Sequence, residues 1–366
     1  MSELWYRRVR GHAERGRPIL LLGVSRRSGT NYLASLLLCH RDTAAPAAPV
    51  AEDHLLSGIT SLERYVGRTA RRWPRRWGDR DSATADLRRA LGEGLLRFLD
   101  DRSDGIRTVS RTPSTANLGR AARWYAGADV VLLVRDGRSV AASLATAWGW
   151  PLELAILEWR RGARRILGLR GRPDVRVADA ARADAVDEPS AGTRFLLVRY
   201  EDVLADLDTA VDRLLRFTGL DPAGFDHDRA RNLPVLGSSY ARDDDGRLTW
   251  EPRSATPGFD PTRRFAEWTE AERARFAWLA GDEQRALGYP DETGPGGPAR
   301  ARMIALDATL PIRLAPWRAR RSVANALRSA RGEWRARRAG QLAGDEDAPT
   351  SSSTSASTAS SSASTR

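Results

Sequence analysis

Short apolar runs alternate with helical patterns through the first two thirds of the chain. Four segments are strand candidates, at 18–24, 106–110, 128–134 and 195–200, of which 106–110 mixes apolar and polar residues. A polar turn and a helical pattern follow the first and the third run, and from 202 to 217 apolar residues recur at helical spacing. Strands that alternate with helices predict an α/β fold of three layers, with a mostly parallel sheet flanked by helices.

The remaining segments set the expected domain limits. Residues 61–100 form a helical stretch rich in arginine and tryptophan, residues 231–264 resemble loops, and residues 268–287 form a helix that stops at a glycine. A glycine- and proline-rich linker follows. We therefore predict three parts: a domain over 1–292, an arginine-rich helical extension over 293–340, and a disordered tail of serine, threonine and alanine over 341–366.

Composition narrows the class of protein. The chain has 366 residues, and its single cysteine, Cys39, excludes a disulfide framework and a cysteine-rich zinc site. Four scattered histidines argue against a histidine metal site, so no metal is expected. No stretch approaches the roughly 18–20 apolar residues that span a bilayer. These features predict a cytoplasmic protein.

The charge is high and unevenly spread. All 59 basic residues are arginines, against 47 acidic residues, which gives a net charge of +12. Residues 300–340 hold eleven arginines and two acids, whereas residues 1–299 have a net charge of only +5. Within the extension, one helical face carries Val323, Leu327, Ala330 and Trp334 among arginines. This pattern suits peripheral contact with an anionic membrane surface, and it equally suits a helix packed on its own domain.

A polar loop between the first strand and its helix carries the first chemical signal. The loop spans residues 25–31, SRRSGTN, and its backbone N–H groups together with the positive helix end can hold an anion. A Walker A loop requires a lysine, and this chain has none, which argues against an ordinary ATPase or GTPase. A polar turn without a ligand is the alternative interpretation of this loop alone.

The second unit of strand, turn and helix adds to the evidence for an anion site. Arg135 lies at the carboxyl end of the strand over 128–134, where open α/β sheets bind ligands. If the helix begins near Gly137, Ser143 lies about two turns into it. We expect Arg135 and Ser143 to hold a second phosphate.

The motifs together resemble the sulfotransferases that use 3′-phosphoadenosine 5′-phosphosulfate (PAPS). They are RSGT at 27–30, R-D-x-R at 135–138 with a serine eight residues after its first arginine, and R-Y-E-D at 199–202. The resemblance extends over residues 18–289. It implies a P-loop NTPase-like sulfotransferase fold and PAPS as the sulfuryl donor, with no metal required.

The resemblance also implies roles for particular residues. The loop that grips the 5′-phosphosulfate would be Arg27, Ser28, Gly29, Thr30 and Asn31. Arg135 and Ser143 would bind the 3′-phosphate, Tyr200 would lie near the adenine, Arg111 would approach the transferred group, and Arg263 and Arg264 would close over the nucleotide. The family often has lysine in place of Arg27, and the loop is one residue longer than expected. That length leaves open whether Arg26 or Arg27 faces the sulfate, and the RSGT pattern favours Arg27.

An alcohol acceptor needs a general base, and Glu52, Asp53 and His54 are the candidates. We favour Glu52, although an ordinary acidic helix start explains these residues equally well. Glu201 and Asp202 are expected to cap the helix that follows them. The aromatic residues Trp148, Trp150 and Trp159 suit an acceptor cleft, and core packing is favoured for them.

These observations predict a sulfotransferase whose acceptor is a hydroxyl of a glycan, glycolipid or natural product. Two alternatives remain open: a small-molecule kinase of related architecture, and a membrane-surface or nucleic-acid binding protein driven by its arginines. Residues 1–299 are only mildly basic, and no nucleic-acid partner is expected.

Overall fold

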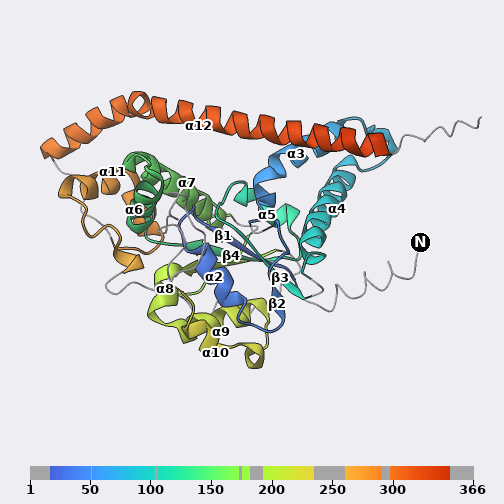
Figure 1. Cartoon of the computed structure of the whole chain (residues 1–366), viewed down its shortest axis with the longest axis horizontal. Coiled ribbons are helices and arrows are strands. Elements are labelled where there is room, and N and C mark those ends of the chain that lie inside the picture. Colours follow the sequence, from blue (N-terminus) through green and yellow to red (C-terminus); the bar gives the residue numbers. More distant parts are fainter. Residues whose placement is uncertain are drawn as a thin grey trace, which may run out of the picture. The chain divides into compact units, whose positions relative to one another are not determined.

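The computed structural model describes residues 17–50, 52–103, 106–172, 175–181, 193–234, 260–290 and 297–346. Within these residues six strands form one sheet in the order β2-β3-β1-β4-β6-β5, and every pairing is parallel (Figure 1). The strands are β1 (Ile19–Gly23), β2 (Thr43–Ala44), β3 (Arg107–Thr112), β4 (Asp129–Val134), β5 (Val177–Asp179) and β6 (Arg194–Arg199). The predicted α/β class with a parallel sheet is confirmed.

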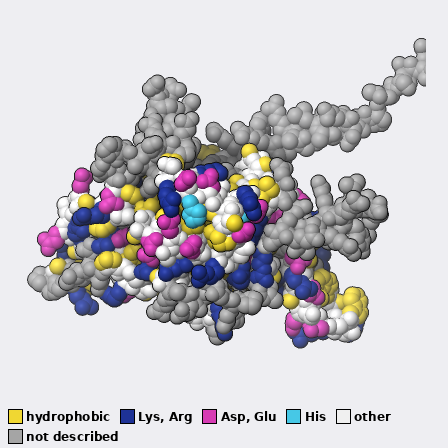
Figure 2. Space-filling view, turned by 90° about the horizontal axis from the view of Figure 1, so that it is seen from below, with side chains coloured by type: hydrophobic (Ala, Val, Ile, Leu, Met, Phe, Trp, Pro, Cys, Tyr) yellow, Lys and Arg dark blue, Asp and Glu magenta, His cyan; other side chains and the backbone are white. Residues whose placement is uncertain are grey.

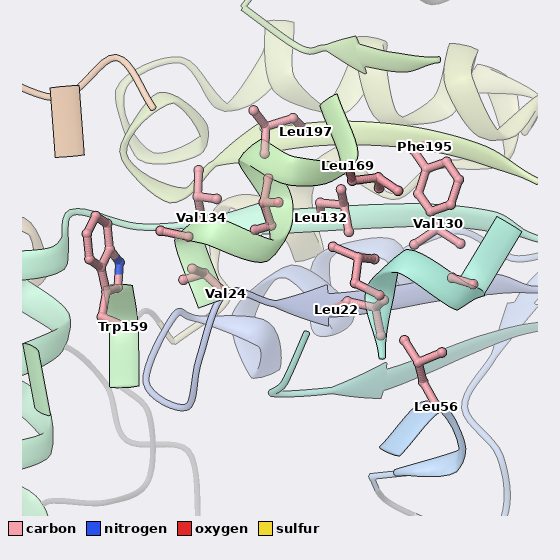
Figure 3. Packing of buried hydrophobic residues seen from close by; sticks show 14 of the residues in the cluster. Leu22, Val24, Leu56, Val130, Leu132, Val134, Trp159, Leu169, Phe195 and Leu197 are labelled. Atoms are coloured by element: carbon pink, nitrogen blue, oxygen red, sulfur yellow. The ribbon is translucent and has the colours of Figure 1, made fainter. Parts of the chain in front are cut away.

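Alternating side chains of the central strands fill two separate cores. Leu20 and Leu22 of β1 belong to one core, and Ile19 and Leu21 belong to the other, as a strand buried on both faces requires. Figure 3 shows the first core, where Leu132 of β4 packs beside Leu197 of β6. The near-continuous apolar runs of the sequence reflect this burial of both faces.

Helices cover both faces of the sheet (Figure 1). The first core is covered by α3 (Leu55–Arg71), α4 (Arg80–Asp100), α5 (Leu118–Trp124), α6 (Gly137–Trp148), α7 (Leu152–Arg170) and α11 (Glu270–Ala286). The second is covered by α2 (Thr30–Leu37), α8 (Tyr200–Ala205), α9 (Leu207–Thr218) and α10 (His227–Arg231). Short 3₁₀ helices among the described residues are η1 (Arg75–Trp77), η3 (Pro222–Gly224) and η4 (Pro261–Arg263).

Two predicted helical stretches are each interrupted. Between α3 and α4 the chain forms η1, because Pro74 has an extended backbone and Gly78 has a φ of 140° that ends the 3₁₀ turn. Between α8 and α9, Asp206 leaves the helical conformation and its side chain accepts the backbone N–H of Thr209. The predicted loops over 231–264 lie mostly outside the described residues.

The carboxyl-terminal helix α12 spans Gly297–Glu346. The chain divides into two compact units, residues 1–303 and 304–366, and α12 begins in the first and continues into the second. It starts within the predicted linker and continues past the predicted end of the extension at residue 340. The domain limits at 292 and 340 stay a prediction. In the described part of the chain, no helix is both long enough and apolar enough to cross a membrane.

Candidate anion site at the carboxyl edge of the sheet

Four neighbouring strands, in the order β3, β1, β4 and β6, bring the predicted site residues to one edge of the sheet. Strand β1 pairs with β3 on one side and with β4 on the other. The order of strands reverses at β1, which is therefore the topological switch point of the sheet. The polar loop follows β1, Arg111 is the second-last residue of β3, Arg135 follows β4, and Tyr200 follows β6. Segments that are distant in sequence therefore meet where α/β sheets commonly bind ligands.

The loop after β1 is held by its own serines. The Ser28 hydroxyl donates to the Ser25 carbonyl oxygen at 2.5 Å and accepts the Ser25 N–H at 3.1 Å. Gly29 has a left-handed φ of 94° and begins α2 without a side-chain cap. The first amide groups of α2 and its positive helix end therefore face the strand edge. The Ser28 hydroxyl is already hydrogen-bonded within the loop. The backbone N–H of Ser28 is therefore the group of this residue that can bind an anion.

The Tyr200 ring packs against this loop at Gly29. A Cβ built on Gly29 would lie 2.5 Å from the Tyr200 ring, so only glycine fits there. The Tyr200 side chain is buried, and its ring lies 4.7 Å below the Arg135 guanidinium carbon. Burial raises the pKa of the Tyr200 phenol to about 12. The observed contacts make Tyr200 a platform for the loop and for Arg135, and its predicted contact with adenine stays a prediction.

Three arginines converge beside the loop. Arg27 donates from Nε to the Ser143 hydroxyl of α6 at 3.0 Å. Arg135 donates from Nη1 to the Arg27 carbonyl oxygen at 2.9 Å and from Nη2 to the Pro261 carbonyl oxygen. Arg264, at the end of η4, interacts electrostatically with both of the other guanidinium groups. The structure thus brings together Arg27, Arg135, Ser143 and Arg264, which the sequence had placed in one site.

The electrostatics of this cluster favour an anion. Burial lowers the pKa of Arg27 to about 10, and the neighbouring Arg135 charge adds to this. Burial also lowers the pKa of Arg264 to about 10, with further contributions from Arg135 and Arg27. Among the described residues, neither Arg27 nor Arg135 forms an ion pair, and the buried Nε atoms of Arg135 and Arg111 have no hydrogen-bond partner. A bound anion would relieve the repulsion between Arg27, Arg135 and Arg264.

The structure distinguishes the two arginines in each adjacent pair. Arg26 is exposed and its guanidinium lies 5.8 Å from the Trp148 ring, whereas Arg27 turns inward to Ser143. Arg263 is likewise exposed, and Arg264 is the one that faces the cluster. The geometry therefore favours Arg27 and Arg264.

Glu201 has a different role from the predicted helix cap. Its carboxylate accepts the Asp136 N–H at 2.9 Å through Oε1 and the Tyr289 hydroxyl at 2.9 Å through Oε2. Burial raises the pKa of Glu201. Glu201 therefore fixes the backbone directly after Arg135, while Asp202 forms an ion pair with Arg199 at 3.0 Å. Sequence reasoning missed this role because Tyr289 lies 88 positions away along the chain.

The three candidate bases lie against the end of β3. Asp53 accepts the Ser110 hydroxyl at 2.6 Å and the Leu55 N–H at 2.9 Å, so both of its carboxylate oxygens are engaged. Its own N–H donates to the Arg111 carbonyl oxygen at 3.2 Å. Glu52 and His54 remain partly exposed, with Oε2 of Glu52 3.2 Å from Nε2 of His54. The geometry favours Glu52 or His54 over Asp53 for proton transfer.

The predicted tryptophans separate into two kinds. Trp159 is fully buried, and its Nε1–H donates to the Arg135 carbonyl oxygen at 3.0 Å. Trp148 and Trp150 are partly buried against the same core, with ring centroids 5.7 Å apart. Core packing is therefore observed for all three. In the described part of the chain, no group of three or more His, Cys, Asp or Glu side chains has the spacing to hold a metal ion.

A parallel sheet with an arginine cluster at its carboxyl edge is typical of α/β proteins that bind phosphorylated ligands. A model of the Sulfotransferase family matches residues 18–224, more than half of the chain. The chain therefore belongs to the sulfotransferase family, and this prediction is confirmed. No curated protein matches the sequence.

Three solved structures are similar at low identity. The sulfotransferase domain from the Synechococcus PCC 7002 olefin synthase is 20% identical, with 75% of this chain and 97% of that chain covered and a TM-score of 0.41. Sulfotransferase STF1 from Mycobacterium tuberculosis H37Rv is 20% identical, with 62% and 73% covered and a TM-score of 0.35. Sulfotransferase STF9 from Mycobacterium avium is 17% identical, with 62% and 72% covered and a TM-score of 0.36.

Proposed function

We propose that this protein transfers the sulfuryl group of PAPS to a hydroxyl of a glycan, glycolipid or natural product. The observation that carries the proposal is the cluster of Arg27, Arg135 and Arg264 at the carboxyl edge of the sheet, with two lowered arginine pKa values. Burial and mutual repulsion of these arginines lower the stability of the protein when no ligand is bound. A nucleotide with phosphate groups at both its 3′ and 5′ positions supplies the missing negative charge.

The residues present fit this donor. Arg27 and the amide groups of residues 28–31 would hold the 5′-phosphosulfate, and Arg135, Ser143 and Arg264 would hold the 3′-phosphate, with Arg263 at the rim. Ser143 contacts Arg27, so the two phosphate subsites adjoin each other. When bound, PAPS supplies an activated sulfuryl group on a phosphate that is a good leaving group.

The side chains of this protein have three tasks during the transfer. Arg27 stabilises the charge that develops on the leaving phosphate, and Arg111 approaches the sulfuryl oxygens. Glu52 accepts the proton of the acceptor hydroxyl as its oxygen bonds to sulfur and the bond between sulfur and the phosphate oxygen breaks. Arginines supply all the positive charge in this scheme, and it assigns no step to a metal.

Ligand stabilisation tests the proposed donor. Adenosine 3′,5′-bisphosphate, the desulfated product, is expected to raise the melting temperature because it binds only the folded protein. ATP with Mg²⁺ serves as the comparison, since it lacks a 3′-phosphate. Stabilisation by ATP with Mg²⁺ alone would instead support the small-molecule kinase.

The pH dependence of binding follows from the two lowered pKa values. Below about pH 10 Arg27 and Arg264 are both protonated, so their contribution to nucleotide affinity is complete and is lost as the pH rises above about 10. We expect titrations with adenosine 3′,5′-bisphosphate to give a constant affinity between about pH 7 and 9, and a lower one below about pH 6, where phosphate gains a proton. An affinity that already falls between about pH 7 and 9 would contradict the assignment.

The proposal also includes a cytoplasmic location and a membrane contact of the basic extension. Cys39 is a free, buried thiol, which suits the reducing cytoplasm proposed for this protein. The basic extension over 293–340 remains a candidate for peripheral contact with an anionic membrane. The acceptor would approach from the side of the segment that carries Glu52, whose neighbours Asp53 and His54 donate backbone N–H groups to Arg111 and Thr112 of β3.

A further inference from the structure

A second concentration of arginines lies outside the anion site, at the end of α3 and in η1. Residues 64–77 contain six arginines and no acidic residue, whereas residues 1–299 as a whole have a net charge of +5. Without this segment, the rest of residues 1–299 would carry a slight net negative charge. We call residues 64–77 the basic tip. It accounts for the basic character of the first 299 residues.

The arginines of the basic tip point to solvent. Val66 and Ala70 of α3 are buried, and Arg64, Arg68 and Arg71 occupy exposed positions of the same helix, followed by the exposed Arg72. Arg75 and Arg76 of η1 are exposed as well. These side chains make no contribution to packing that would explain their number.

Charge pairing elsewhere makes the basic tip unusual for this protein. On the neighbouring α4, Arg89 pairs with Asp86 at 2.6 Å and Arg88 pairs with Glu63 of α3 at 3.1 Å. Within the basic tip, the closest approach of an acidic side chain among the described residues is Asp81, 3.8 Å from Arg75. The face formed by α9 and α10 carries interspersed basic and acidic side chains (Figure 2). Unlike these elements, the basic tip carries six arginines and no acidic residue.

Exposed aromatic side chains accompany these arginines. Trp77 is 74% exposed and Tyr65 is 56% exposed, although large aromatic residues are usually buried. The Arg76 guanidinium lies 5.8 Å from the Trp77 ring. Exposed tryptophan and tyrosine beside arginines is the composition of surfaces that rest at the boundary between lipid headgroups and acyl chains.

We propose that the basic tip is a docking surface for a membrane with anionic headgroups. The arginines would bind the headgroup phosphates, and Trp77 and Tyr65 would enter the interface. Each arginine near such a surface contributes about 1 kcal/mol, so a cluster of six is sufficient for reversible attachment. Helix α3 has 17 residues and spans about 25 Å, with Glu52 and His54 before its first turn and the basic tip at its far end. Docking is therefore separate from the nucleotide site, and this inference does not depend on the proposed donor.

Vesicle binding by the full-length protein tests the proposal. The probe is phosphatidylcholine vesicles with phosphatidylglycerol, compared with vesicles of phosphatidylcholine alone. The triple variant Arg68→Gln, Arg71→Gln, Arg72→Gln is expected to bind the anionic vesicles on the order of 100-fold more weakly. Trp77→Ser keeps the charge and is expected to weaken binding about tenfold through the lost apolar contact. Because these side chains are exposed, the melting temperatures should stay unchanged.

Two control variants each remove three positive charges from another surface of the protein. Arg216→Gln, Arg229→Gln, Arg231→Gln on α9 and α10 is expected to leave vesicle binding unchanged. Arg313→Gln, Arg318→Gln, Arg320→Gln on α12 is expected to weaken it less than the triple in the basic tip. Wild-type binding that is lost only in the α12 triple would overturn the proposal in favour of the extension. Binding of duplex DNA but not of vesicles, lost in the basic-tip triple, would overturn it in favour of a nucleic-acid surface.

Discussion

Replacing Arg27 with glutamine is expected to lower sulfuryl transfer by about 100- to 1000-fold and to raise the melting temperature of the ligand-free protein. The loss of activity follows from the removal of a preorganised donor at the leaving phosphate. The gain in stability follows from the removal of a buried charge that Arg135 and Arg264 repel. A single substitution would thus raise the stability of the protein and lower its activity.

The sign of the stability change follows from the pKa. Burial and Arg135 lower the pKa of Arg27 to about 10, so near neutral pH the folded protein holds this arginine protonated at an energetic cost. The cost is on the order of 1–3 kcal/mol and disappears with the charge, less the lost hydrogen bond to Ser143. We expect the melting temperature to rise by a few degrees.

Arg26→Gln is the matched control. It removes the same charge from the adjacent, exposed position, so activity is expected to change by no more than a small factor. Thermal unfolding and turnover of both variants are the measurements. A large loss of activity in Arg26→Gln with normal activity in Arg27→Gln would show that the inward-facing arginine has been misassigned.

Replacing Glu52 with glutamine is expected to lower turnover by about 100- to 10,000-fold, because a glutamine cannot accept the proton of the acceptor hydroxyl. The side chain is partly exposed and lies 3.2 Å from His54, so the fold should tolerate the change. Affinity for adenosine 3′,5′-bisphosphate is expected to stay the same, because the proposed role of Glu52 is in accepting a proton and not in binding the nucleotide. Steady-state turnover and nucleotide titration together test this prediction.

Two neighbouring variants sharpen the assignment. Asp53→Asn is expected to lower the melting temperature while most activity remains, because Asp53 holds Ser110 and the first turn of α3. His54→Gln separates the two remaining candidates. If Glu52→Gln keeps full activity and His54→Gln loses it, the histidine is the base and the role given to Glu52 is wrong.

Much of the fold was predictable from local patterns. Runs such as 130–134 are apolar throughout because both faces of β4 are buried, and this pattern predicted a parallel sheet between two helix layers. The loop after β1 and Arg135 were predictable because each directly follows a strong strand signal. Their meeting at one edge follows from the parallel arrangement alone.

Other features depend on contacts between distant parts of the chain. The hydrogen bonds of Glu201 to Asp136 and Tyr289 arise only when β4, β6 and the end of α11 pack together. The choice of Arg264 over Arg263 depends on the orientation of η4, and Asp53 became a structural residue because Ser110 of β3 lies beside it. None of these pairings leaves a periodic signal in the sequence, so only the structure reveals them.

We propose that the arginine cluster recognises a nucleotide with two phosphate groups. Isothermal titration of the wild-type protein with adenosine 3′,5′-bisphosphate and with adenosine 5′-monophosphate tests it most directly. The bisphosphate is expected to bind on the order of 100-fold more tightly, as charge-assisted hydrogen bonds from Arg135 and Arg264 to the 3′-phosphate predict. Equal affinity for the two nucleotides, or binding of neither, would contradict the claim.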